Sequence, residues 1–241
     1  MAYACNSGTT GQYVSFADHA ALSLGATFGL GGWCRCLDHS GTGVHWILSW
    51  DNWGANNSLG IRVGQASHPS VPGKFLCHVK DSAGVMGYAY SPDGLWTDTD
   101  WHYLLFTCDG TTLKTFFDNV QVGTGNVSSI TWPINSSVPA FFACQVGAEP
   151  WCPAQFADWA KWDTCPDDAM RVNLAAGYAA DWYPENRAWY LPALDDLVEV
   201  DVPLSVTDQS GGIVAGPSLV YPSSHGVFQS AIFKSRTFHA A

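Results

Sequence analysis

The chain has 241 residues, of which 47% are apolar and 13% charged, so it is too apolar to be disordered and can fill a sizeable core. No apolar run reaches the roughly 18 residues that a membrane helix needs, which argues against membrane insertion. Ten Lys and Arg against 21 Asp and Glu give a net charge of −11, so the basic face that binding to nucleic-acid phosphates requires is not expected.

Short apolar or alternating segments separated by turn residues follow one another along the chain, which is the pattern of an antiparallel sandwich. Only three of the 21 acidic residues are Glu, whereas Gly occurs 24 times and Pro 13 times, so helix formers are scarce and turn formers abundant. The expected strands are 13–16, 27–37, 44–50, 59–63, 74–80, 101–108, 113–118, 120–122, 140–146 and 155–162. We therefore predict an all-β fold, a two-sheet antiparallel β-sandwich with one short helix.

Residues 101–118 predict a hairpin, because apolar side chains alternate along both halves and the sequence Asp-Gly-Thr-Thr at 109–112 is a turn signal. The side chains expected to face inward are Leu104, Phe106, Cys108, Leu113, Thr115 and Phe117. Residues 74–80 alternate in the same way, with Phe75, Cys77 and Val79 on one face. The apolar face of the hairpin must pack against another sheet.

The single helix is expected at 168–176. Thr164, three residues before Asp167, predicts a capping box with Pro166 in the first turn, and Gly177 is suited to end the helix.

Residues 181–241 differ in character from the rest, with several prolines and an aromatic cluster. We therefore divide the chain into a sandwich domain at 1–180 and a C-terminal extension at 181–241. Two alternatives remain for the extension: it fixes the protein to a neighbour in an assembly, or it packs back as extra strands on its own sandwich. The residues expected to contact a partner are Trp182, Tyr183, Trp189, Tyr190, Phe233, Arg236 and Phe238.

The eight cysteines are expected to be mostly buried thiols. Several fall in step with apolar neighbours on the predicted strands, where cysteine acts as a small core residue. The segment after Met1 lacks the basic and apolar regions of a secretory signal, which also argues against disulfides. A zinc site would use Cys144, Cys152 and Cys165, but their spacing is irregular and no CxxC pair exists.

The order of these segments resembles the concanavalin A-like jelly rolls of the laminin G-like type, over about residues 13–177. The matching segments are 13–19, 28–37, 47–50, 74–75, 101–103, 108–114, 117–123 and 156–162. The resemblance implies a packing role for His102, which follows Trp101. It does not define a function, since this fold serves lectins, hydrolases and adhesion modules alike.

No catalytic constellation is recognisable, so we do not expect an enzyme. Related glycoside hydrolases carry two glutamates on one strand, whereas Glu199-Val200-Asp201 has no second glutamate within reach. A sugar-binding surface is instead expected on one loop, because exposed aromatics beside amides and carboxylates suit a pyranose ring. Its residues would be Trp50, Asp51, Trp53, Asn56 and Asn57. No cofactor is required, although the oxygen ligands of the loop 51–58 leave calcium open as an alternative to ordinary turn chemistry.

Three functions remain. The first is a non-catalytic binding or structural protein on the surface of a bacteriophage virion, as phage proteins with laminin G-like domains imply. It would be assembled in the host cytoplasm and held by other virion proteins or by copies of itself, and it could bind a cell-surface glycan. The second is a free carbohydrate-binding lectin or adhesin outside the cell. The third, a glycoside hydrolase, is the least supported.

Overall fold

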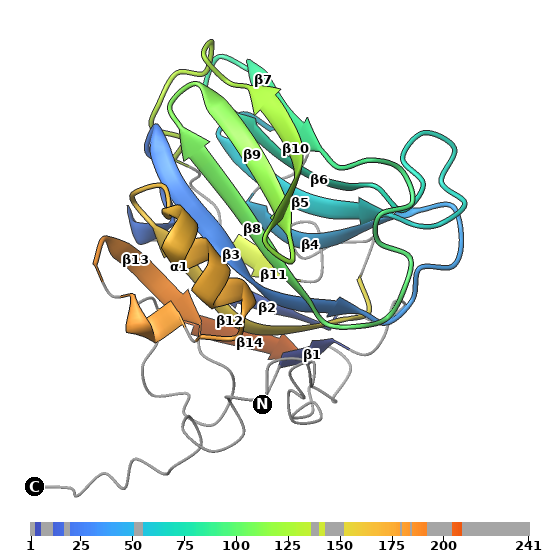
Figure 1. Cartoon of the computed structure of the whole chain (residues 1–241). Coiled ribbons are helices and arrows are strands. Elements are labelled where there is room, and N and C mark those ends of the chain that lie inside the picture. The colour runs from blue at the N-terminus through green and yellow to red at the C-terminus, as the bar shows by residue number, and fades with distance from the viewer. Residues whose placement is uncertain are drawn as a thin grey trace, which may run out of the picture.

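A computed structural model describes residues 3–5, 12–16, 20–50, 55–135, 140–142, 152–178, 180–183, 185–191 and 204–208. Within these residues the chain forms two antiparallel sheets packed face to face, with one α-helix and two short 3-10 helices, η1 (Ala20–Leu22) and η2 (Ala180–Trp182) (Figure 1). The predicted two-sheet antiparallel sandwich with one short helix is confirmed. None of the described helices is long and apolar enough to cross a membrane.

The first sheet has the strand order β1-β12-β3-β8-β9-β10, and β13 also pairs with β12. Its described strands are β1 (Tyr3–Cys5), β3 (Thr27–Cys36), β8 (His102–Asp109), β9 (Thr112–Phe117), β10 (Val120–Asn126), β12 (Ala154–Trp162) and β13 (Arg187–Leu191).

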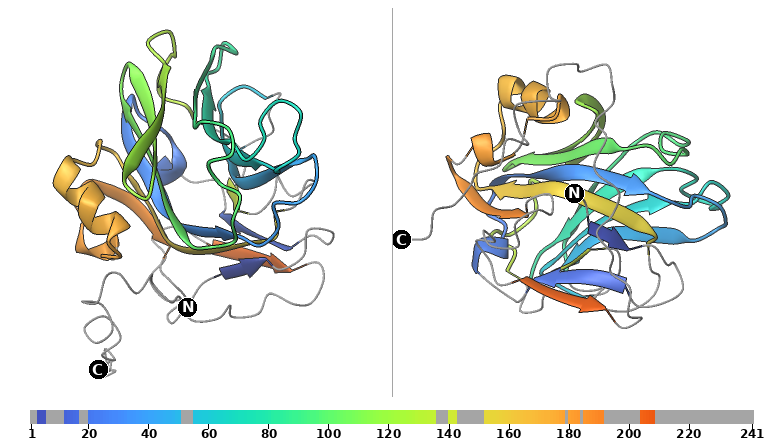
Figure 2. Two further views of the ribbon diagram at one scale, coloured as in Figure 1. Left: turned by 45° about the vertical axis from the view of Figure 1, so that its right-hand side comes forward. Right: turned by 90° about the horizontal axis from the view of Figure 1, so that it is seen from below.

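The second sheet has the order β14-β2-β11-β4-β5-β6-β7. Its described strands are β2 (Gln12–Phe16), β4 (Val44–Trp50), β5 (Ser58–Gly64), β6 (Phe75–Lys80), β7 (Met86–Tyr90), β11 (Ala140–Phe142) and β14 (Leu204–Asp208). Figure 2 shows the two sheets as separate layers, with β7 and β10 at neighbouring edges.

The main core lies between the sheets and follows the alternation of the strands. Phe75, Cys77 and Val79 are fully buried in it, as predicted. The hairpin of β8 and β9 is also confirmed, because its inward apolar side chains belong to this core and Thr115 is fully buried. The hairpin turn depends on Asp109, whose Oδ1 accepts hydrogen bonds from the amides of Thr111 (3.1 Å) and Thr112 (2.8 Å).

Helix α1 (Asp168–Ala175) covers the outer face of the first sheet (Figure 1). Its Leu174 is buried in a second apolar cluster with Trp33, Tyr103 and Phe116 among others. The predicted capping residue was wrong: Asp167, not Thr164, is the N-cap, and its Oδ1 accepts from the Met170 amide at 2.8 Å. The helix begins one residue after Asp167, so only this carboxylate reaches the third amide of the first turn.

The strands continue past residue 180, so the predicted boundary there does not divide the sheets. Strand β13 pairs with β12 and strand β14 pairs with β2. Trp189 of β13 is 1% exposed and belongs to the main core. The described part of residues 181–241 therefore pairs with its own sandwich, and Trp189 contributes to the core.

Five of the cysteines are buried thiols, which confirms the prediction for Cys34, Cys36, Cys77, Cys108 and Cys152. Cys165 departs from it, because it precedes α1 in an exposed turn. The side chains of Cys5 and Cys144 lie outside the described residues. In the part of the chain that the structure describes, no group of three or more His, Cys, Asp or Glu side chains is placed to hold a metal.

Candidate functional site

The outer face of the second sheet carries a ladder of aromatic and basic side chains. Arg62, Leu76 and Tyr90 lie opposite one another across β5, β6 and β7, and Gly60, His78 and Tyr88 form the next row. The alternate residues of the same strands face the core, so both rows point away from it. We use the name tyrosine face for Arg62, Lys74, Tyr88 and Tyr90.

Tyr88 is the accessible aromatic of this face, with 44% of its surface exposed. Its ring centroid lies 4.7 Å from that of half-buried Tyr90. Lys74 Nζ lies 5.6 Å from the centre of the Tyr90 ring, within cation–π range, and 2.7 Å from Asp93 Oδ1. An exposed ring therefore stands beside a second ring and an ammonium group.

A buried layer lies next to the tyrosines and fixes the strands that carry them. Trp46 and His78 meet edge to face, with 5.9 Å between centroids. A Cβ on Gly60 would lie 2.2 Å from His78 Cε1 and 2.5 Å from Trp46 Cζ3, so only glycine leaves room for this contact. Burial, with the nearby charges of Arg62 and Lys80, lowers the pKa of His78 to about 3, so its imidazole is neutral at physiological pH.

Arg62 of the tyrosine face remains charged. Burial lowers the pKa of Arg62 to about 10, which leaves the guanidinium protonated at neutral pH. Its Cζ lies 5.5 Å from the centre of the Trp46 ring. Burial and the neighbouring Tyr88 raise the pKa of Tyr90, so its phenol keeps the proton and can donate a hydrogen bond.

Strand β7, which carries both tyrosines, is supported by β10 of the other sheet. A Cβ on Gly125 would lie 1.9 Å from the carbonyl oxygen of Tyr88, and one on Gly123 would lie 2.1 Å from that of Tyr90. The two glycines therefore allow the backbones to meet. Beside this contact is a hollow of about 470 Å³, lined by Thr111, Thr112, Thr124, Gly125, Asn126 and Ser128.

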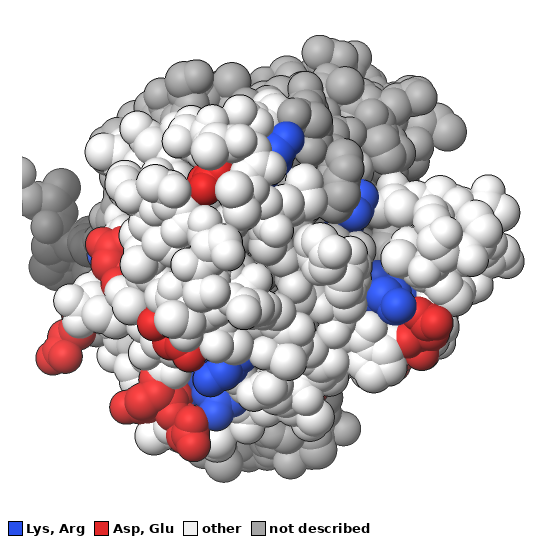
Figure 3. Space-filling model, turned by 90° about the horizontal axis from the view of Figure 1, so that it is seen from above, with Lys and Arg blue, Asp and Glu red and all other residues white. Residues whose placement is uncertain are grey.

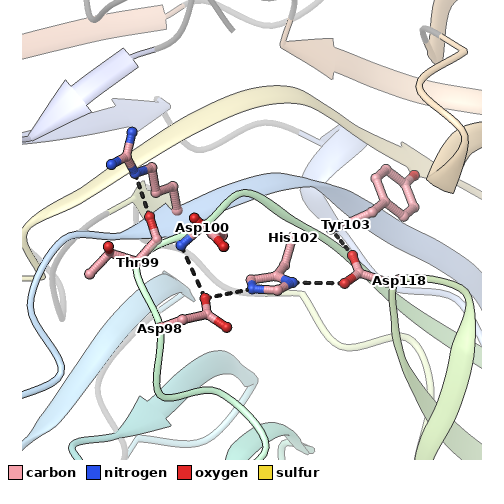
Figure 4. A network of polar contacts seen from close by, with 7 residues as sticks. Asp98, Thr99, Asp100, His102, Tyr103 and Asp118 are labelled. Carbon is pink, nitrogen blue, oxygen red and sulfur yellow. Dashed lines mark hydrogen bonds and ion pairs between the residues drawn. The ribbon is translucent and has the colours of Figure 1, made fainter. Parts of the chain in front are cut away.

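A second polar cluster lies at the start of β8 (Figure 4). The His102 ring is held between two carboxylates, with Nδ1 2.7 Å from Asp118 Oδ2 and Nε2 2.8 Å from Asp98 Oδ1. Asp118 Oδ1 also accepts from the Tyr103 amide at 2.8 Å. The ring lies 4.2 Å from the Phe117 ring, between centroids. This cluster joins β8 to the turn after β9, so its role is structural, in agreement with the packing role expected for His102.

Replacing His102 by glutamine should give a pH-dependent loss of stability. Burial lowers the pKa of His102, but its bonds to Asp118 and Asp98 outweigh burial, and the pKa is raised overall. A histidine whose pKa is higher in the folded state than in the unfolded state stabilises the folded protein. This stabilisation is complete at pH values below the unfolded pKa of about 6.5, and it is lost as the pH rises through the folded pKa. The difference in Tm between the wild type and His102→Gln, measured from pH 5.5 to 9, should therefore shrink at alkaline pH. A difference that grows with pH would contradict this account.

Three of the five residues of the predicted sugar-binding loop are described, and they differ in exposure. Trp50 is only 3% exposed and packs in the main core, because it ends β4 pointing inward, so its ring cannot stack on a sugar. Asn56 is exposed, and its Nδ2 donates to the Ser82 carbonyl at 2.9 Å. Asn57 adopts a positive φ of 56° in the turn before β5. Asp51 and Trp53 lie outside the described residues.

The residues predicted to contact a partner also differ in exposure. Trp182 is 56% exposed and touches Tyr178 edge to face at 5.0 Å between centroids. Tyr183 is half-buried and bound to α1 through its hydroxyl, which accepts from Asn173 Nδ2 at 2.6 Å. Trp189 is buried and cannot contact a partner. The Tyr190 side chain, Phe233, Arg236 and Phe238 lie outside the described residues.

Sequence reasoning missed the tyrosine face. Residues 86–90 read Met-Gly-Tyr-Ala-Tyr, in which the two tyrosines fall on one side of a strand and Gly87 and Ala89 on the other. This alternation was the available signal.

Three basic groups at the described surface have acidic neighbours. Ion pairs join Lys74 to Asp93, Lys114 to Asp109 at 3.7 Å, and Arg171 to Asp168 at 2.6 Å. On the face shown in Figure 3, Lys and Arg side chains lie at separate places, and most of the described surface is uncharged. The charged side chains on the described part of this face therefore do not gather into one broad patch.

No protein-family model matches the sequence, and no curated protein matches it. Among solved structures, the chain is similar to the crystal structure of the binding domain of Paraclostridial Mosquitocidal Protein 1, with a TM-score of 0.56 and 9% sequence identity. The match covers 73% of this chain and 46% of that one, so the chain spans less than half of its structural neighbour. At this identity the likeness concerns the fold alone, and it places the chain among antiparallel β-sandwiches.

Proposed function

We propose that the protein is a non-catalytic binding module that recognises a glycan through the tyrosine face. The observation that carries the proposal is Tyr88, an exposed ring held against Tyr90 with a lysine beside it. A tyrosine ring offers a rigid apolar surface with a polar end, which suits the apolar face of a pyranose and its hydroxyls. The similar solved structure is named as a binding domain, which agrees with this role.

The charges favour an acidic sugar. Lys74 and Arg62 both lie near enough to Tyr90 to influence its phenol. On a chain of net charge −11, these two cations lie beside Tyr90, and Lys74 is also paired with Asp93 at 2.7 Å. A carboxylate-bearing sugar, such as a uronic acid, would bind there in competition with Asp93.

Replacing Tyr88 by alanine should weaken glycan binding by about fivefold, since an aromatic contact contributes about 1 kcal/mol and 1.4 kcal/mol is a factor of about ten. The measurement is titration calorimetry of the full chain with a uronic-acid oligosaccharide chosen from a glycan array. Tyr88→Phe keeps the ring and should bind nearly as well as the wild type. Val120→Ala, at an exposed position of β10, is the control for a surface change elsewhere. Equal affinities of Tyr88→Ala and the wild type would overturn the proposal.

The location is part of the same proposal. We place the protein on the surface of a bacteriophage virion, held there by other virion proteins or by copies of itself. Buried thiols agree with assembly in a reducing cytoplasm, and exposed Trp182 is available for a neighbour. Mass spectrometry of purified particles tests this: the protein should remain at constant stoichiometry through density-gradient purification. Its presence only in the medium would favour the free lectin or adhesin.

A further inference from the structure

Two cysteines from distant parts of the chain meet at one end of the first sheet. Cys36 is the last residue of β3, and Cys152 lies two residues before β12 begins at Ala154. Cys36 is opposite Ala154 in the register, and the next bond along runs from the Leu37 amide to the Pro153 carbonyl at 2.7 Å. Because side chains alternate, residue 152 falls on the same side as residue 154 and therefore as Cys36. Their sulfur atoms are 3.9 Å apart.

The surroundings of Cys36 favour its thiolate. The Cys152 thiol lowers the pKa of Cys36 by hydrogen bonding, burial opposes this, and His39 and His45 lower it further. The net direction is down, although Cys36 is fully buried. The thiolate is the form of cysteine that attacks a disulfide.

Two other core cysteines, Cys77 and Cys108, lack these surroundings. Burial and the neighbouring Cys108 raise the pKa of Cys77, and burial raises the pKa of Cys108 to about 11. These two thiols stay protonated at neutral pH and are poor nucleophiles. The Cys36–Cys152 pair is thus chemically distinct from the ordinary core cysteines of the same sandwich.

We propose that Cys36 and Cys152 form a disulfide when the folded protein meets a small disulfide oxidant such as glutathione disulfide. Cys36 and Cys152 are both fully buried, so the oxidant reaches them when the end of β3 opens locally. The Cys36 thiolate then attacks one sulfur of the oxidant, forming a mixed disulfide and releasing one glutathione thiolate. Cys152 then loses its proton and attacks the Cys36 sulfur, which breaks the mixed disulfide and releases the second glutathione thiolate. The two protein thiols are oxidised, and one glutathione disulfide is reduced to two thiols. The protein sulfurs need to approach by about 2 Å to reach bonding distance.

The new bond would fasten β3 to the start of β12 across a separation of 116 residues. Closing a loop of this length restricts the unfolded chain strongly, so Tm should rise by about 5 to 15 °C on oxidation. A protein made in a reducing compartment would become more stable after release into an oxidising medium.

The test is incubation of the native full chain with glutathione disulfide, followed by intact mass and peptide mapping without reductant. We expect a loss of two hydrogen masses, a single linked peptide pair containing Cys36 and Cys152, and a Tm increase that dithiothreitol reverses. Cys36→Ser and Cys152→Ser should each abolish the mass loss and the Tm increase. Cys165→Ser, at an exposed position, and Cys34→Ser, at a neighbouring buried one, should keep both.

If a serine variant fails to fold, peptide mapping of the oxidised wild-type chain still shows which two cysteines are linked. A linked pair that involves any other cysteine would overturn the proposal. So would a mass loss that appears only after denaturant is added, or the absence of any mass loss in the folded protein.

Discussion

Replacing Trp189 by alanine is expected to destabilise the protein by about 3 to 5 kcal/mol, the usual cost of removing a large aromatic from a core. Trp189 is 1% exposed and lies among the core side chains between the two sheets. Its strand is held by antiparallel pairing with residues 159–162 of β12. The free energy of unfolding, measured with urea, should fall accordingly.

Trp182 provides the matched control, because it is the same residue type in the same segment but is 56% exposed. Trp182→Ala should change the free energy of unfolding by no more than about 0.5 kcal/mol, as is usual at the surface. Truncation after residue 180 should be at least as damaging as Trp189→Ala, because it removes β13 and β14 together. A truncated chain with unchanged stability would show that the segment is an independent extension after all.

The sequence predicted the central strands because their periodicity is strong. In β6 and β8, every second side chain is an apolar core residue, and Asp109-Gly110 supplies the turn of the β8–β9 hairpin. Both signals are local. The alternation of side chains follows from the pleat of a single strand, and the turn needs a positive φ at one residue, here 95° at Gly110. Tertiary packing did not alter them.

Strands β1, β7, β13 and β14 were missed for the opposite reason. Each is only three to five residues long, too short for periodicity to stand out. Strands β13 and β14 also pair with β12 and β2, which are distant in sequence. Their place in the sheets depends on non-local partners, which a single sequence does not show.

The candidate site could not be predicted for a related reason. Trp50 and Trp53 suggested a sugar platform because tryptophan next to Asn and Asp is typical of one, yet the strand parity of β4 turns Trp50 inward. The sequence does not show that Tyr88 and Tyr90 lie beside His78 and Arg62, because this depends on the register between β5, β6 and β7. A binding surface made from three strands is a property of the pairing, not of any one segment.

The position of Tyr88 depends in turn on Asp81, in the turn between β6 and β7. This carboxylate is fully buried, and its Oδ1 accepts from the amides of Ala83 and Val85, each at 2.9 Å. Its Oδ2 accepts from the Thr131 amide, also at 2.9 Å, which joins the turn to a loop 50 residues away. Replacing Asp81 by alanine should therefore destabilise the protein by about 2 to 4 kcal/mol, because hydrogen bonds to a charged group contribute about 1.5 to 3 kcal/mol each and water replaces some of them.

The loss caused by Asp81→Ala should depend on pH in a defined direction. Burial raises the pKa of Asp81, but hydrogen bonds from Thr131, Val85 and Ala83 outweigh it and hold the pKa below its ordinary value. A depressed carboxyl pKa stabilises the folded state fully above the unfolded value of about 3.9, and this stabilisation is lost as pH falls through the folded pKa. The stability difference between the wild type and Asp81→Ala, measured by urea unfolding, should therefore be constant from pH 7 to 5 and narrow below pH 4. Asp93→Ala, which removes only an exposed ion pair, should cost no more than about 1 kcal/mol at any pH.

Because the Asp81 turn leads directly into β7, Asp81→Ala should also weaken glycan binding. A variant that loses stability but keeps full affinity would show that the turn does not determine the position of Tyr88.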